Sequence, residues 1–125
     1  MAKIKGTGRA DTLFGKANQE NDIRGGNGND TIHGSNLADA LFGEGGNDTI
    51  FGGDGNDYLH GGYGVDALYG GAGDDKLNVT TGKADYLPPN AALEIMDGGE
   101  GHDNAHIDVK GATVYGAEAR TLEIG

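Results

Sequence analysis

Aspartate recurs every nine residues through the middle of the chain. Six of these residues close a glycine-rich stretch of the form GGxGxD, or a variant of it: Asp30, Asp39, Asp48, Asp57, Asp66 and Asp75. A hard divalent cation such as calcium prefers roughly six to eight oxygen ligands, which carboxylates and backbone carbonyls can supply. Glycine-rich turns leave their carbonyls accessible. The pattern therefore predicts metal sites built from oxygen.

A large aliphatic residue follows each of these aspartates at the second position, so the aliphatics also repeat every nine residues: Ile32, Leu41, Ile50, Leu59, Leu68 and Leu77. Each nonamer is expected to form a six-residue turn and a three-residue strand whose middle side chain points inward. Two nonamers then make one coil, and stacked coils form two parallel sheets around the aliphatic residues. Imperfect units extend the repeat backward through Ile23 to Gly6–Phe14, and an isolated unit begins at Gly98.

The repeat GGxGxDxUx, in which U is the aliphatic residue, resembles the RTX (repeats-in-toxin) hemolysin-type calcium-binding nonapeptide. The resemblance covers about Gly6–Asn78 and Gly98–His106. It implies an all-β, right-handed parallel β-roll with two nonapeptides per coil, followed by a short β-rich C-terminal cap. The expected parts are a calcium-binding roll at 1–78, a loop insertion at 79–97, and a final repeat with capping strands at 98–125. Period-two alternation predicts those strands at Ile107–Val109, Thr113–Tyr115 and Thr121–Ile124.

Carboxylates that share an ion should be eighteen residues apart, because alternate turns lie on the same edge of the coils. One edge then carries Asp30, Asp48 and Asp66, preceded by Asp11, and the other carries Asp39, Asp57 and Asp75, preceded by Asn21. The pairs Asp30/Asp48, Asp48/Asp66 and Asp57/Asp75 rank first, Asp39/Asp57 next, and pairs with Asp11 or Asn21 last. About three to six ions follow from this pairing.

The resemblance also implies the remaining ligands, which in the family are carbonyls of turn residues. Carried over to the matching positions, they belong to Gly25, Asn27, Gly46, Gly52, Asp54, Gly62, Gly64, Gly71 and Gly73. Three turns depart from the consensus, with Arg9, Leu37 and Glu44 at glycine positions. A positive φ would strain Leu37, so its replacement by glycine is expected to raise calcium affinity at Asp39.

Composition supports folding that is coupled to metal. The chain of 125 residues carries a formal charge of -11, is 35% hydrophobic, and contains 26 glycines and no cysteine. So little apolar surface does not offset the entropy of ordering this much glycine, and bound metal can supply the difference. The acidic balance argues against nucleic acid and anionic membranes as partners. No apolar run is long enough to span a membrane, and the N-terminus lacks the apolar core of a cleaved signal peptide.

The resemblance implies a secreted, extracellular bacterial protein, exported unfolded by a type I secretion system and folding where calcium is plentiful. The chain is expected to be a non-enzymatic module, because no set of nucleophile, base and acid stands out. The alternatives left open are an enzyme and a carbohydrate-binding or adhesive module attached to a polysaccharide-modifying enzyme. The second would use outward-facing residues at the ninth repeat position: Phe14, His33, Phe51 and Tyr69 on one sheet, and Arg24, Phe42, His60 and Asn78 on the other. Stacking between strands is the simpler interpretation of these two columns.

Overall fold

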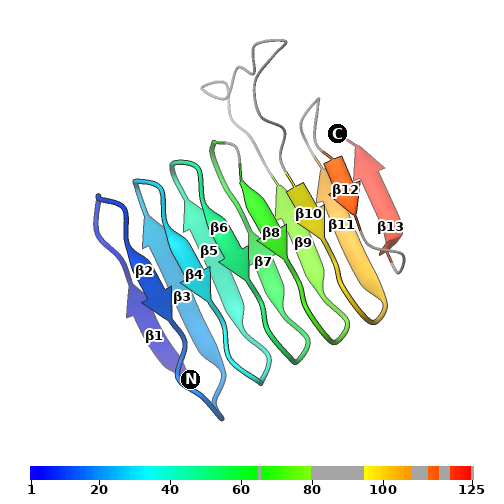
Figure 1. Ribbon diagram of the computed structural model, residues 1–125, viewed down its shortest axis with the longest axis horizontal. Coiled ribbons are helices and arrows are strands. Elements are labelled where there is room, and N and C mark those ends of the chain that lie inside the picture. Colours follow the sequence, from blue (N-terminus) through cyan, green and yellow to red (C-terminus); the bar gives the residue numbers. More distant parts are fainter. Residues whose placement is uncertain (65, 80–94, 108–112, 116–118, 125) are drawn as a thin grey trace.

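The computed structural model describes residues 1–64, 66–79, 95–107, 113–115 and 119–124. Successive strands alternate between two sheets, so that the coils lie side by side from the N-terminal to the C-terminal end (Figure 1). The seven-stranded sheet A has the order β1-β3-β5-β7-β9-β11-β13, and the six-stranded sheet B has the order β12-β10-β8-β6-β4-β2. The chain is a parallel β-solenoid, as expected for a β-roll. The part that the structure describes contains no helix, and hence none that could cross a membrane.

The strands are short because each repeat supplies only the segment x-U-x to a sheet. Sheet A consists of β1 (Ala2–Lys5), β3 (Asn21–Gly26), β5 (Ala40–Glu44), β7 (Tyr58–His60), β9 (Lys76–Val79), β11 (Asp103–Ile107) and β13 (Ala119–Ile124). Sheet B consists of β2 (Thr12–Phe14), β4 (Thr31–His33), β6 (Thr49–Phe51), β8 (Ala67–Tyr69), β10 (Ile95–Asp97) and β12 (Thr113–Tyr115). Strand β1 precedes the first unit expected from the sequence, and its Ile4 pairs with Ile23.

The core is a double row of aliphatic side chains between the two sheets. The predicted inward positions from Ile23 to Leu77 are all at most 2% exposed: Ile23, Ile32, Leu41, Ile50, Leu59, Leu68 and Leu77. In sheet A, Leu41 pairs with Leu59 and Leu59 with Leu77, while in sheet B, Ile32 pairs with Ile50 and Ile50 with Leu68. Each coil therefore adds one aliphatic residue to each row, and this spacing places every turn above the previous one.

The C-terminal strands continue both sheets. Strand β11 pairs with β9 and β13, and β10 pairs with β8 and β12. Strand β9 ends at Val79 and β10 begins at Ile95, so the interior of the expected loop insertion, residues 80–94, lies outside the described residues. Strand β12 coincides with the predicted strand Thr113–Tyr115, and β13 contains Thr121–Ile124. Of the expected strand Ile107–Val109, only Ile107 is described.

Candidate metal centres in the turns

The turns form two edges of the solenoid, and each turn has six residues except 15–21, which has seven. The first edge connects sheet A to sheet B and consists of the turns 6–11, 25–30, 43–48 and 61–66. The second edge connects sheet B to sheet A and consists of 15–21, 34–39, 52–57, 70–75 and 98–103. The assignment of the aspartates to two edges, which the nine-residue period predicted, is therefore confirmed.

A ladder of hydrogen bonds connects the aspartates along each edge. The backbone N–H of Asp30 donates to Oδ1 of Asp48, and that of Asp48 donates to Oδ1 of Asp66, both at 2.8 Å. On the second edge, Asp39 donates to Asp57 at 2.9 Å and Asp57 to Asp75 at 2.8 Å. Every one of these partners is eighteen residues away in sequence. The expected spacing of paired carboxylates is thus the spacing that the fold produces.

The second oxygen of several of these carboxylates is buried without a hydrogen-bond partner. This holds for Oδ2 of Asp30, Asp48, Asp57 and Asp75, and the four residues are at most 2% exposed. The Oδ2 atom faces the first glycine of its own turn, where a Cβ on Gly25 or Gly52 would come within 2.5 or 2.6 Å of it. A buried, unpaired carboxylate oxygen is costly unless it meets a cation or a proton.

Burial raises the pKa values of these aspartates, because an ionised carboxylate is less stable away from water. It raises the pKa of Asp57 to about 8 and the pKa values of Asp48 and Asp75 to about 7, and it also raises the pKa of Asp30. Neighbouring carboxylates add to the effect: Asp103 and Asp74 act on Asp75, and Asp30 and Glu44 on Asp48. The fold therefore brings negative charges close together. These charges can be neutralised either by protonation or by a bound cation.

Backbone carbonyls also lie close to these turns. A Cβ on Gly52 would come within 2.6 Å of Oδ2 of Asp57 and within 2.5 Å of the carbonyl oxygen of Gly70 in the next turn. A Cβ on Gly71 would collide with the carbonyl oxygen of Gly53, and one on Gly73 with that of Gly55. Both glycines have positive φ, +87° and +113°, which glycine adopts without strain. The nine carbonyl candidates implied by the resemblance all lie in turns with this glycine-rich geometry: Gly25, Asn27, Gly46, Gly52, Asp54, Gly62, Gly64, Gly71 and Gly73.

These donors fit calcium. Stacked turns offer buried carboxylate oxygens and carbonyls, which are the hard ligands that calcium takes in flexible numbers. Among the residues that the structure describes, no group of three or more His, Asp or Glu side chains gathers in one place. A site would therefore take its Asp residues from two stacked turns and complete its shell with backbone oxygens.

One candidate ligand, Asp103, was missed by the sequence reasoning. The backbone N–H of Asp75 donates to Oδ1 of Asp103 at 2.8 Å across a separation of 28 residues, and Asp103 is 1% exposed. The turn 98–103 thus lies on the turn 70–75, although the sequence between β9 and β10 interrupts the nine-residue period. The signal was present in the motif GGEGHD, which matches the consensus turn.

In the turn 34–39, the backbone of Leu37 does not have the positive φ that the sequence analysis expected. Among the described residues other than glycine, positive φ occurs at Asn18 and Glu44, so Leu37 is not strained and that prediction is wrong. Ser35 explains the difference, because its backbone N–H and its Oγ donate to Oδ2 of Asp39 at 2.6 and 3.0 Å. The Ser35 hydroxyl also accepts a hydrogen bond from the N–H of Leu37 at 3.2 Å. This turn closes with a serine hydroxyl and needs no glycine at Leu37.

The outward-facing residues at the ninth repeat position contact one another along each sheet. Rings of Phe14, His33, Phe51 and Tyr69 stack with centroids 4.8, 5.0 and 5.1 Å apart and interplanar angles of 5°, 9° and 11°. On sheet A, the guanidinium of Arg24 lies 4.4 Å from the ring centroid of Phe42, and His60 is tilted by 41° to that ring. The interpretation as stacking between strands is therefore supported for sheet B, because the interior rings cover one another's faces.

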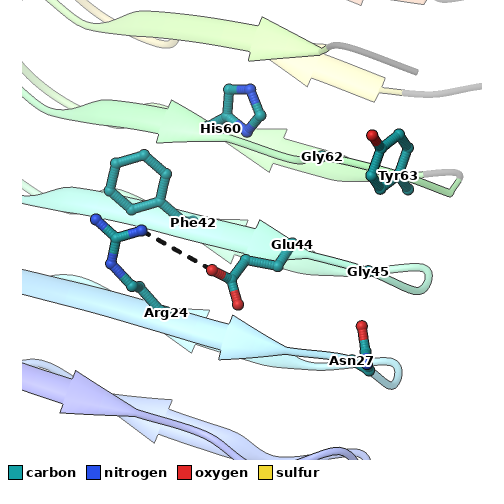
Figure 2. A pocket seen from close by; sticks show the side chains of 8 residues that line it. All are labelled: Arg24, Asn27, Phe42, Glu44, Gly45, His60, Gly62 and Tyr63. Carbon is teal, nitrogen blue, oxygen red and sulfur yellow. Dashed lines mark ion pairs between the residues drawn. The ribbon is translucent and has the colours of Figure 1, made fainter. Parts of the chain in front are cut away.

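Sheet A carries an open groove beside its column (Figure 2). The groove has a volume of about 520 Å³, and Glu44 on one side of it forms a 3.8 Å ion pair with Arg24. Its lining consists of Arg24, Asn27, Phe42, Glu44, Gly45, His60, Gly62 and Tyr63. Burial lowers the pKa of His60, which favours its neutral form. The groove therefore combines aromatic groups with polar groups, and it extends from sheet A onto the turns of the first edge.

Comparison with known proteins assigns the repeats to a described motif. A family model for the RTX calcium-binding nonapeptide repeat, in four copies, matches residues 5–41, 18–50 and 42–77. No curated protein and no solved structure matches the chain. The matched residues include both edges of turns from Gly6 to Asp75.

Proposed function

Because the chain belongs to the RTX calcium-binding nonapeptide-repeat family, we propose that it is a non-enzymatic module that folds when several calcium ions bind between its stacked turns. The observation that carries this proposal is the line of buried carboxylate oxygens without partners at Asp30, Asp48, Asp57 and Asp75. Without metal these carboxylates repel one another across stacked turns. Bound calcium converts the repulsion into a link between coils, so that the free energy of binding contributes to folding.

The same physics supports a role in an exported protein. A chain that gains stability from calcium stays weakly folded where calcium is scarce and becomes ordered where it is plentiful, which suits export in the unfolded state by a type I secretion system. RTX repeats are typical of exported bacterial proteins. Secretion of the chain into medium by cells with and without such a system, measured by immunoblot, tests this part of the proposal separately from calcium binding.

The decisive experiment is far-UV circular dichroism during a calcium titration of the chelated protein. We expect a cooperative gain of β signal with calcium and a much weaker one with magnesium. Magnesium demands near-octahedral geometry at about 2.0–2.1 Å and releases its waters reluctantly, so turns shaped for a larger ion suit it poorly. A full β spectrum in the presence of chelator, unchanged by calcium, would contradict folding on binding.

The groove on sheet A favours a second function, the binding of a sugar polymer. Aromatic groups in a groove with hydrogen-bonding neighbours suit the mixed apolar and polar surface of a sugar, and Phe42, Tyr63 and His60 provide such a mixture. Affinity electrophoresis in gels containing polysaccharides tests this function. Retardation that Phe42→Ala abolishes and Phe51→Ala preserves would support it, because Phe51 lies in the stacked column on sheet B. Equal migration of all three proteins in every gel would contradict it.

A further inference from the structure

The turns fall into two chemical classes. Glycine-type turns have positive φ at their second and fourth positions, as at Gly53 and Gly55 or at Gly71 and Gly73. They are 25–30, 43–48, 52–57, 61–66, 70–75 and 98–103, with Glu44 at the second position of 43–48. Hydroxyl-type turns have Thr or Ser at the second position and no residue with positive φ, and they are 6–11 and 34–39.

In the hydroxyl-type turns the aspartate carboxylate is already satisfied. Oδ2 of Asp11 accepts hydrogen bonds from the backbone N–H and the Oγ1 of Thr7 at 2.6 and 2.9 Å. Ser35 makes the same two contacts with Oδ2 of Asp39. The other oxygen of Asp39 accepts from the backbone N–H and from Nδ2 of Asn21, at 2.9 and 2.8 Å. Protein donors therefore occupy the position at which Oδ2 of Asp30, Asp48, Asp57 and Asp75 has no hydrogen-bond partner.

The remaining N-terminal turn, 15–21, is closed by an amide. Oδ1 of Asn21 accepts from the N–H of Lys16 at 2.9 Å, and its Nδ2 donates to the carbonyl of Gln19 at 3.0 Å. Asn21 is fully buried and carries no charge. This turn therefore offers no carboxylate to a cation, although it stands in the same row as Asp39 and Asp57.

The N-terminal part of the chain also differs from the rest in net charge. The first 24 residues contain five of the nine Lys and Arg residues and three acidic ones, a net charge of +2. Residues 25–79 contain nine acidic residues and a single lysine, a net charge of -8. The end of the solenoid that contains the turns 6–11 and 15–21 thus has no excess negative charge to neutralise, whereas the turn 34–39 lies in the acidic part.

We infer that the Thr7 and Ser35 hydroxyls replace calcium in their turns, which confines the ions to interfaces between two glycine-type turns. This inference rests on the proposed calcium binding and specifies where it occurs. The interfaces are 25–30 with 43–48, 43–48 with 61–66, 52–57 with 70–75, and 70–75 with 98–103. The N-terminal end of the roll is closed by its own side chains, and Asp39, which the sequence placed among the ligands, serves as an acceptor for Ser35 and Asn21.

Conversion of a hydroxyl-type turn into a glycine-type turn tests the inference. The double variant Ser35→Gly/Leu37→Gly makes the turn GGNGAD, which faces the glycine-type turn 52–57. We expect it to bind one more calcium ion per chain than the wild type, as counted by equilibrium dialysis. The matched control is Leu37→Gly alone, which retains the Ser35 hydroxyl and should bind the wild-type number. A gain of an ion in the single variant, or no gain in a double variant with a normal β spectrum, would overturn the inference.

Two further proteins keep the test independent of whether that double variant folds. Asp39→Asn retains an acceptor oxygen for Asn21 and should leave the number of bound ions unchanged, so the loss of an ion would make Asp39 a ligand and overturn the inference. Thr7→Gly/Arg9→Gly makes the corresponding change in the terminal turn that faces 25–30 and should also gain one ion. If the wild type binds no calcium, the proposed function itself fails. If it binds calcium but loses an ion in Asp39→Asn, only the assignment of turns fails.

Discussion

The backbone N–H of Asp30 donates a 2.8 Å hydrogen bond to Oδ1 of Asp48, the aspartate directly above it on the same edge. This contact holds one carboxylate oxygen in place and leaves the Oδ2 atoms of both residues buried without hydrogen bonds. The protein fold therefore orients the aspartates, and a cation has only to occupy the space beside oxygens that are already aligned. Such alignment lowers the entropic cost of assembling a site.

Asp48→Asn should weaken calcium binding strongly, because Asp48 belongs to the central turn of three stacked glycine-type turns and would serve ions above and below it. We expect the calcium midpoint of folding to rise by at least about tenfold, on the order of 1.4 kcal/mol. Asp54→Asn is the matched control, since it removes the same charge from an exposed side chain whose proposed contribution is its carbonyl. Titration by circular dichroism compares the two, and equal effects would mean that net charge alone governs the response.

Gly73→Ala should destabilise the calcium-loaded protein by more than about 1 kcal/mol. Gly73 has a φ of +113°, and its Cβ would collide with the carbonyl oxygen of Gly55, so both backbone strain and a steric clash oppose alanine. Gly8→Ala is the control, because no atom lies within 4 Å of its added Cβ and its φ is not positive. Thermal unfolding in excess calcium measures both. Similar melting temperatures for the two variants would show that the close approach of stacked turns is not required.

Glu44→Gly should be more stable than Glu44→Ala by about 1 kcal/mol. Glu44 has a φ of +74°, a conformation that glycine adopts freely and alanine does not. Both variants lose the partly exposed 3.8 Å ion pair with Arg24, so their difference isolates the backbone effect. Urea unfolding in excess calcium gives the comparison. Leu37→Gly should bring no such benefit, and a stabilisation there would restore the idea that Leu37 is strained.

Acidification should favour the folded state of the calcium-free protein. Burial raises the pKa values of Asp48 and Asp75 to about 7 and that of Asp57 to about 8, from 3.8. The folded state therefore binds more protons than the unfolded chain at intermediate pH. The associated stability is fully present near pH 4 and is lost as the pH rises to about 8.

The far-UV circular dichroism of the chelated protein at pH 5 and pH 8 measures this dependence, and we expect more β signal at pH 5. Asp57→Asn should weaken the dependence on pH, since it removes one of the titrating carboxyls while keeping its shape. A β signal that rises from pH 5 to pH 8 would show that these carboxylates are not buried as described. In the calcium-loaded protein the dependence should reverse, because calcium requires the ionised form.

The sequence by itself determined the solenoid, its core and the partnership of aspartates. A strict nine-residue period leaves one arrangement in which Ile23 to Leu77 are buried together and Asp30 meets Asp48, because each coil consumes two nonamers. The tertiary structure decided which carboxylates still need a cation. Whether Asp39 is satisfied depends on the conformation of its turn, which brings the Ser35 hydroxyl to Oδ2 and removes the need for positive φ at Leu37. Stacking also decided that Asp103 joins Asp75, because pairing of β9 with β11 bridges an interruption that a fixed period cannot cross.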